Sequence, residues 1–151
     1  MSTSTMAAPS RQARRARGAV AALFLTNGAV FFNIVPRYPQ IKDDLDVSNA
    51  VLGTAIAGYS IGALVAGLHA GAAIRRFRSA RVAAFGIVTT AIATLAIPIA
   101  PHWVAFGAVL VVVGALDAVV DVAQNAHGLR VQRLYGRSIL NSLHGCGASA
   151  P

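Results

Sequence analysis

The chain has 151 residues, of which 56% are hydrophobic and only 12% are charged, and its formal net charge is +8. The charged fraction is about half that of a typical soluble domain, and the sequence contains no Glu. A soluble domain needs polar residues to cover its surface, so this composition excludes an ordinary soluble globule and a disordered chain. The single cysteine, Cys146, excludes an intramolecular disulfide framework and a cysteine-based metal cluster.

Apolar segments separated by charged clusters fill most of the chain. Ahead of them lies a basic N-terminal segment, residues 1–17, which we expect to be disordered and cytoplasmic. The apolar segments cover residues 18–35, 49–74, 82–100 and 103–124. Each is close to the roughly 20 residues that an α-helix needs to cross the hydrocarbon core of a bilayer. The sequence therefore predicts an all-α integral membrane protein with four transmembrane helices.

A cleaved signal peptide is the alternative interpretation of the first segment, because four arginines precede it. That segment is long for a signal peptide, and it ends in Asn33-Ile34-Val35-Pro36 rather than in a small-x-small cleavage site. Three further apolar segments follow it. A membrane helix is therefore the favoured interpretation.

The basic residues alternate between the two sides of the predicted helices. Of the 13, four precede the first helix, two follow it, four follow the second, none follows the third and three follow the fourth. The positive-inside rule then places the N-terminus on the cytoplasmic side of the cell membrane. Short clusters beside membrane helices are typical of contact with anionic lipid headgroups, whereas a nucleic-acid-binding protein carries a basic stripe on one face. We therefore expect the lipid bilayer, and no nucleic acid, as a partner.

The second predicted helix is rich in small residues. Gly58 and Gly62, and again Gly67 and Gly71, are spaced by four and so lie on one face of a helix. Lipid tails give no hydrophobic drive for helix association, so close backbone approach has to supply the attraction. We interpret these glycines as static packing positions, with a sliding contact between helices as the alternative.

Several polar side chains fall within the predicted helices. Asn27 and Asn33 are in the first, where we expect interhelical hydrogen bonds, with ligand contact as the alternative. Asp117, Asp121 and Asn125 follow one another at intervals of four and share one face of the fourth. Counted from the outer end of that helix, the two acids lie about 21 Å and about 27 Å into a core of about 30 Å.

These depths predict different roles for the two acids. Asp117 is still in hydrocarbon, where a carboxylate costs up to about 3 kcal/mol, so it needs a partner, a water-filled cavity or a proton. A proton-coupling or cavity-facing role and a structural pair both remain open for it. Asp121 lies near the cytoplasmic interface, where an ion pair with Arg75, Arg76 or Arg78 is favoured over substrate contact.

Motifs of soluble enzymes are absent from the sequence. It contains no Gly-x-Ser-x-Gly, no phosphate-binding loop with Gly-Lys-Ser/Thr and no His-Glu-x-x-His. With no Glu, one Cys and one Lys, most acid–base and metal chemistries lack their side chains. We therefore expect no enzymatic activity, no cofactor and no metal site.

Three stretches resemble a known family. Residues 37–42 read Arg-Tyr-Pro-Gln-Ile-Lys, residues 67–81 run from Gly-Leu-His-Ala-Gly to Arg-Arg-Phe-Arg-Ser-Ala-Arg, and residues 121–145 run from Asp-Val-Ala-Gln-Asn-Ala-His-Gly to Leu-His-Gly. They resemble the first loop, the loop between helices 2 and 3, and the end of helix 4 with the start of helix 5 in the major facilitator superfamily. The similar branch is a bacterial one related to sugar permeases. The second stretch lacks the usual acidic residue and Gly, so this loop is a degenerate version.

The resemblance implies a transporter of twelve helices, in two halves of inverted three-helix repeats, that moves a small solute by alternating access. This chain would hold its N-terminal part, one three-helix repeat plus helix 4. Cavity-facing residues of the family come from helices 1 and 4, which implies Asn27, Asn33 and Asp117 as substrate-cavity candidates. The family's cytoplasmic gate network corresponds here to four residues: Arg75, Arg76, Asp121 and Asn125.

The last six residues depart from the family pattern. After Gly145 the family continues with a string such as Leu-Trp-Ser-Val-Gly-Ala, whereas residues 146–151 read Cys-Gly-Ala-Ser-Ala-Pro. A one-base shift of the codons converts one string into the other, so we expect a single-base deletion at codon 145 and an aberrant, frame-shifted tail. Residues 18–145 would then form a partial transmembrane domain that is inactive alone, and the nucleotide sequence checks this.

Two functions of other classes remain as alternatives. A small oligomeric four-helix exporter would carry a membrane-embedded Glu in its first helix, where this chain has only Asn27 and Asn33. A non-transporting membrane interaction protein would need no buried acid, whereas Asp117 is predicted to be one.

Overall fold

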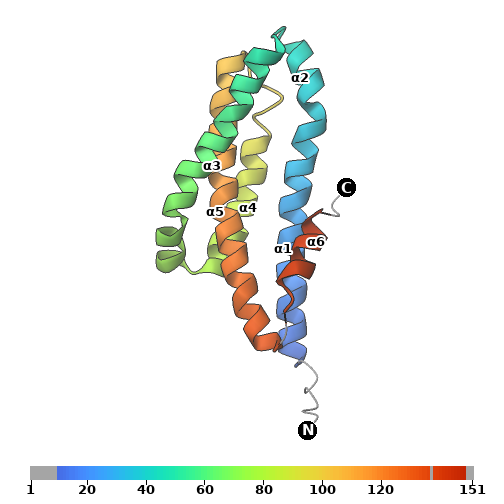
Figure 1. Ribbon diagram of the computed structural model, residues 1–151, viewed down its shortest axis with the longest axis vertical. Coiled ribbons are helices and arrows are strands. Elements are labelled where there is room, and N and C mark those ends of the chain that lie inside the picture. Colours follow the sequence, from blue (N-terminus) through green and yellow to red (C-terminus); the bar gives the residue numbers. More distant parts are fainter. Residues whose placement is uncertain (1–9, 137, 149–151) are drawn as a thin grey trace.

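The structure is a computed structural model that describes residues 10–136 and 138–148. In these ranges the chain is helical, in the order α1 (Arg11–Ile34), η1 (Val35–Arg37), α2 (Tyr38–Asp44), α3 (Asn49–Phe77), α4 (Ser79–Thr94), α5 (Trp103–Tyr135) and α6 (Leu140–Ala148). Figure 1 shows the long helices side by side, with α2 at one end and α6 against α1. The predicted all-α membrane architecture is confirmed.

The first helix begins earlier than the hydropathy of the sequence predicts. α1 starts at Arg11, and the hydroxyl of Ser10 caps it by accepting a hydrogen bond from the amide of Ala13 at 3.1 Å. Arginine is a good helix former and needs no apolar environment, so the basic segment continues the helix outward. The expected disorder is therefore wrong for residues 11–17, and residues 1–9 lie outside the described part.

The third predicted helix is shorter than expected. α4 ends at Thr94 rather than at residue 100, because Pro98 disfavours helical backbone just before it and the chain turns through residues 95–97. Its 16 residues span about 24 Å at a rise of 1.5 Å per residue. Among the described residues, three stretches are long and apolar enough to cross a membrane, Arg11–Asp44, Asn49–Phe77 and Trp103–Tyr135, and α4 is a shorter apolar helix beside them.

The fourth predicted helix is longer than expected. α5 begins at Trp103, as predicted, but runs to Tyr135 instead of residue 124. No residue in the added part breaks a helix until Gly136, whose left-handed φ of 71° ends it. At about 50 Å, α5 exceeds the thickness of a hydrocarbon core. Its C-terminal turns therefore extend beyond the ends of α3 and α4 and lie beside the start of α1 (Figure 1).

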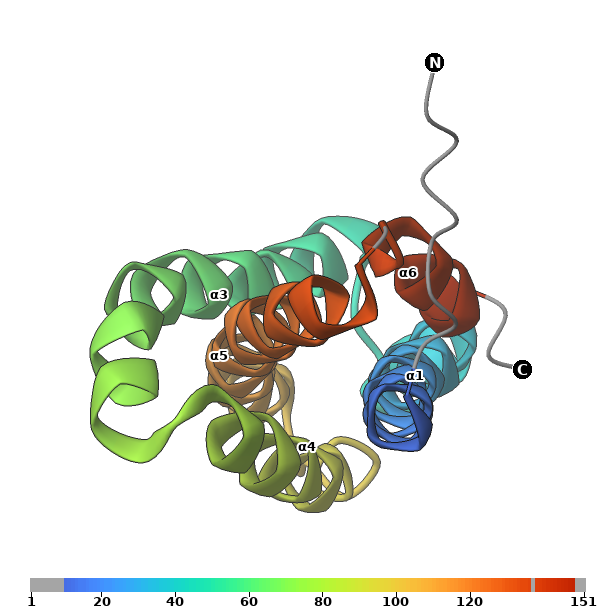
Figure 2. The same ribbon diagram turned by 90° about the horizontal axis from the view of Figure 1, so that it is seen from below.

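Seen along the bundle, α5 lies between α3 and α4, and α1 faces it from the other side with α6 attached (Figure 2). Two apolar clusters hold this arrangement together. One lies around Phe106 and Leu110 of α5 near the α2 end, and the other joins Val20 and Phe24 of α1 to Leu143 of α6. Three of the functional candidates, Asn27, Asp117 and Asp121, lie along α1 and α5 between these clusters.

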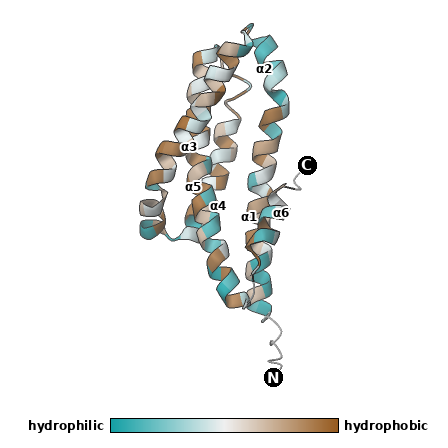
Figure 3. Ribbon diagram, in the orientation of Figure 1, coloured by the Kyte–Doolittle hydropathy of each residue, from teal (hydrophilic) through white to brown (hydrophobic). Residues whose placement is uncertain are grey.

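Hydrophobic residues follow one another along α3 and α4 (Figure 3), and many of their large side chains are exposed. Leu68 of α3 and Phe85 of α4 are 77% and 72% exposed, and other large apolar side chains follow the same pattern. In water such a surface would be costly, whereas a bilayer covers it with lipid tails. These faces agree with a chain that lies within the membrane.

The arginine clusters gather toward one end of the bundle. The start of α1, the α3–α4 junction and the end of α5 all lie toward the end that carries the N-terminus (Figure 1). These segments contain most of the basic residues, whereas α2 and the α4–α5 turn lie at the other end. The alternation that the sequence predicts is therefore reproduced in space, while the side of the membrane stays a prediction.

Candidate functional site

Glycines allow α3 and α5 to approach each other closely. A Cβ atom at Gly62 would lie 2.0 Å from the carbonyl oxygen of Val111, and one at Gly114 would lie 2.1 Å from that of Tyr59. Only hydrogen atoms fit in these positions, so the two backbones touch directly. The packing role predicted for Gly58 and Gly62 is confirmed.

The second glycine pair of α3 is not used in the same way. A Cβ at Gly67 would meet the Cβ of Ala118 at 3.9 Å, an ordinary van der Waals distance. A Cβ at Gly71 would approach only the side chain of Arg75 in its own helix. Close backbone approach thus ends before this part of α3, where the helices diverge in Figure 1.

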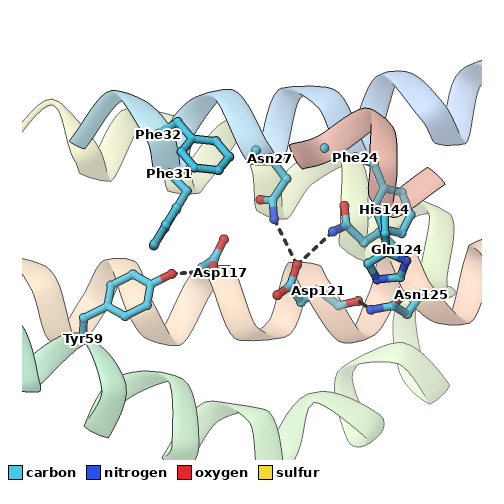
Figure 4. Close-up of a pocket in the computed structure, with 12 residues that line it drawn as sticks. Phe24, Asn27, Phe31, Phe32, Tyr59, Asp117, Asp121, Gln124, Asn125 and His144 are labelled. Carbon is cyan, nitrogen blue, oxygen red and sulfur yellow. Dashed lines mark hydrogen bonds between the residues drawn. The ribbon is translucent and has the colours of Figure 1, made fainter. Parts of the chain in front are cut away.

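Close approach at Gly114 brings the ring of Tyr59 to Asp117 on the next turn of α5. The phenol hydroxyl of Tyr59 donates a hydrogen bond to Oδ2 of Asp117 at 2.5 Å (Figure 4). Asp117 therefore has the polar partner that its depth in the helix predicts. Sequence reasoning did not assign Tyr59 to the site, although its place one turn before Gly62 on the glycine face was a usable signal.

Asp121 receives two amide donors. Oδ1 accepts a hydrogen bond from Nδ2 of Asn27 on α1 at 3.0 Å and another from Nε2 of Gln124 at 2.8 Å (Figure 4). The side chain of Asn125 instead donates to the backbone carbonyl of Asp121 at 2.9 Å. The interhelical hydrogen bond expected of Asn27 is confirmed, and Gln124 is a member of the site that sequence reasoning missed.

Within the described part of the chain, Asp121 does not form the ion pair expected with Arg75, Arg76 or Arg78. Arg75 and Arg76 lie in the last turn of α3, where both are exposed, and the guanidinium of Arg76 stacks on Phe77 at 5.7 Å from the ring centre. In this region the glycines of α3 no longer contact α5, and the two helices diverge. The arginines at the end of α3 therefore lie away from Asp121. The amides of Asn27 and Gln124 take their place, and the gate network stays a prediction.

These side chains enclose a pocket between α1, α3, α5 and α6 with a volume of about 330 Å³. Its polar wall comes from α5 and Asn27, and aromatic rings from α1, α3 and α6 cover the rest (Figure 4). The lining residues are Phe24, Asn27, Gly28, Phe31, Phe32, Tyr59, Asp117, Asp121, Gln124, Asn125, His144 and Gly147. It is large enough for a small solute.

The pocket combines two carboxylates with an unused acceptor. Asp117 and Asp121 both line it, and among its described lining residues there is no Lys or Arg. Oε1 of Gln124 is buried and has no hydrogen-bond partner among the described residues. The two carboxylates can accept hydrogen bonds, so a molecule with a hydroxyl or amino group would be stabilised here.

The remaining cavity candidate lies elsewhere. Asn33 is exposed and lines a second pocket of about 330 Å³ together with Arg37, Thr94 and Pro98. It is six residues from Asn27, which at 100° per residue turns it to another side of α1. The structure therefore brings Asn27, Asp117, Asp121 and Asn125 together and leaves Asn33, Arg75 and Arg76 apart.

Comparison with known proteins gives one match. Residues 20–127 match the sequence model of the Major Facilitator Superfamily, and this match covers α2, α3, α4 and most of α1 and α5, including both acidic residues of the pocket. No curated protein and no solved structure is significantly similar to the chain.

Proposed function

Because the chain belongs to the major facilitator superfamily, whose members are membrane transporters, we propose that it moves a small solute across the cell membrane by alternating access. The observation that carries this proposal is the pocket between α1 and α5, which Asp117, Asp121 and Gln124 line together. Polar groups inside a membrane bundle are costly and are typical of a solute or ion path.

The lining of the pocket suits a solute with both polar and apolar surfaces. Carboxylates and amides can bind hydroxyl or amino groups, and the rings of Phe24, Phe31 and Tyr59 can stack against a flat apolar face. This chemistry agrees with the proposed relation to sugar permeases and also with an organic cation. The experiment below includes both classes.

We further propose that Asp117 couples transport to protons. Asp117 and Asp121 are one helical turn apart, and two ionised carboxylates at this spacing repel each other in surroundings of low dielectric. A proton on Asp117 removes that repulsion, while Tyr59 still donates to Oδ2 and leaves Oδ1 for the exchange. Binding of a proton and of the solute would thus be linked in one pocket.

The gate and the orientation complete the proposal. Arg75 and Arg76 would meet Asp121 and Asn125 in another state of the transport cycle, in which the end of α3 approaches α5. The N-terminus would be cytoplasmic, since the arginine-rich ends of α1, α3 and α5 lie together. A protease site placed ahead of Arg11 should then be cut only from the cytoplasmic side.

Proton movement driven by a solute tests the proposal. The full chain is reconstituted in phosphatidylglycerol and phosphatidylcholine liposomes that contain a pH-sensitive dye, and a hexose, a neutral amino acid or tetraphenylphosphonium is added outside. We expect one of these solutes to change the internal pH. Asp117→Asn should lower the initial rate by about tenfold or more, because it removes the proton site.

The matched control is Asp43→Asn, which removes an exposed carboxylate at the other end of the bundle and should leave the rate unchanged. Unchanged solute-driven proton flux in Asp117→Asn would contradict coupling through this residue. Absence of solute movement by the wild-type chain with every member of the panel, checked with radiolabelled solutes, would contradict transport by these 151 residues alone and would support the expectation that they form a partial, inactive domain.

A further inference from the structure

A third pocket, of about 400 Å³, lies between the α3–α4 junction and the C-terminal part of α5, away from the proposed transport site. Arg78, Arg81, His127 and Arg130 line it, and no acidic residue does so among the described residues. Three guanidinium groups around one pocket give it a strong positive potential, which favours an anion. Guanidinium groups bind phosphate oxygens in particularly good geometry.

The backbone adds to this potential. Arg78 has a positive φ of 70° and lies between the two helices. It ends α3, and α4 begins at the next residue, Ser79. The first amides of an α-helix have no partner within the helix, and they form the positive end of its dipole. The N-terminus of α4 therefore presents free donors at the wall of the pocket.

Ser79 supplies an independent sign of a ligand. Its side chain is 0% exposed and lines the pocket, yet its hydroxyl has no hydrogen-bond partner among the described residues. Such a hydroxyl loses its hydration without gaining a bond, which costs about 1–3 kcal/mol. A ligand oxygen in the pocket would accept the bond that Ser79 can donate.

An apolar pocket adjoins this basic one and shares Arg81 with it. Phe77, Val82 and Phe85 form the remainder of its lining, and both phenylalanines are exposed on the outer face of α3 and α4. A ligand that combines a phosphate with a hydrocarbon chain could occupy both pockets at once. Basic pockets between membrane helices are known to bind the headgroups of anionic lipids.

We propose that these two pockets together bind one anionic phospholipid. Arg78, Arg81 and Arg130 bind its phosphate, and Ser79 and the first amides of α4 donate to the phosphate oxygens. The hydrocarbon chain lies along Phe77 and Phe85. This site does not depend on the proposed transport function, since none of these residues lines the acidic pocket.

Lipid binding by the purified full chain tests the proposal. Native mass spectrometry in detergent measures the affinity for phosphatidylglycerol, for phosphatidylcholine and for inorganic phosphate as a competitor. We expect phosphatidylglycerol to bind about tenfold more tightly than phosphatidylcholine. Arg130→Gln should weaken its binding about fivefold, in line with one lost arginine near an anionic lipid.

Ser79→Ala should weaken phosphatidylglycerol binding about twofold to fourfold, because it removes one neutral donor. Arg133→Gln is the matched control: it removes the same charge one turn further along α5, outside the pocket, and should change the affinity less than about twofold. A far-ultraviolet circular dichroism spectrum like that of the wild type shows that each variant is folded.

Four results are decisive. Equal affinity for the two lipids, or equal losses in Arg130→Gln and Arg133→Gln, would overturn the proposal, because general surface charge would then explain binding. Displacement of phosphatidylglycerol by millimolar phosphate would support a phosphate site. Inorganic phosphate that binds as tightly as the lipid would overturn the assignment to a lipid and leave free phosphate as the ligand.

Discussion

Two faces of α5 differ in how closely they approach the neighbouring helices. Toward α3, Gly114 and the backbone at Val111 allow the helices to touch without side chains between them. Toward α1, Asp117 and Asp121 project into a pocket of about 330 Å³ that keeps the two helices apart. One side of α5 thus packs tightly against α3, the closed side, and another borders the pocket, the open side. Gly114 and the two acids lie within two turns of each other along the helix.

The close contact between α3 and α5, on the closed side, positions polar side chains on the open side. Tyr59 takes part in both, since its carbonyl oxygen lies against Gly114 and its hydroxyl binds Asp117 on the next turn. A wider separation of α3 from α5 would withdraw the phenol from the carboxylate. Dense packing on one side of a helix therefore fixes the geometry of the polar site on the other, and substitutions can test this relation.

The largest effect is expected from Gly114→Ala. Its new methyl group would collide with the carbonyl of Tyr59, and backbone cannot move aside as a side chain can, so we expect a loss of about 3 kcal/mol or more. Thermal unfolding in detergent measures it. Gly53→Ala is the control, because a Cβ there meets no atom within 4 Å. Equal melting temperatures for the two variants would show that α3 and α5 are not in direct backbone contact.

A smaller effect is expected on the open side from Asn27→Ala. The variant removes the interhelical donor to Asp121, and hydrogen bonds of this kind in membrane bundles contribute about 0.6–1.7 kcal/mol. The control is Asn33→Ala in the same helix, because Asn33 forms no hydrogen bond to another described residue through its side chain. If both variants lose the same stability, the bond between α1 and α5 contributes nothing measurable.

The smallest effect is expected from Gly67→Ala, below the closed part of the contact. Its methyl group would lie at 3.9 Å from Ala118, and alanine is favoured over glycine inside a helix by up to about 1 kcal/mol. We expect a melting temperature equal to or slightly above that of the wild type. A strong loss would show that the close contact extends further along α3 than Gly62.

The helices and their membrane character were predictable because they depend on local sequence. Runs of apolar residues without charge gave four helical segments, and the spacing of Gly58 and Gly62 gave the packed face. Helix ends were predicted less well, since polar residues such as Arg11 can extend a helix beyond its apolar part. Pro98 lies within the third apolar run, and α4 ends four residues before it.

The site was predictable only in part, because its members come from four helices. The interval of four residues placed Asp117 and Asp121 on one face, and burial of a carboxylate required a partner for Asp117. The identity of that partner depends on how closely α3 approaches α5, which no local pattern contains. Asp121 shows the same limit, since Asn27 and Gln124 replaced the arginines that the loop sequence favoured.

The backbone contact at Gly62 and Gly114 also has a mechanical meaning. Two helices that touch through their backbones cannot slide past each other there without a collision, so we expect the contacting parts of α3 and α5 to move together, while the end of α3 beyond Gly62 stays free to approach α5. A change in the width of the pocket must then come from α1, which carries α6 with it. The hydrogen bond from Asn27 to Asp121 joins α1 to α5. It stabilises the present width of the pocket and has to break if α1 moves away from α5.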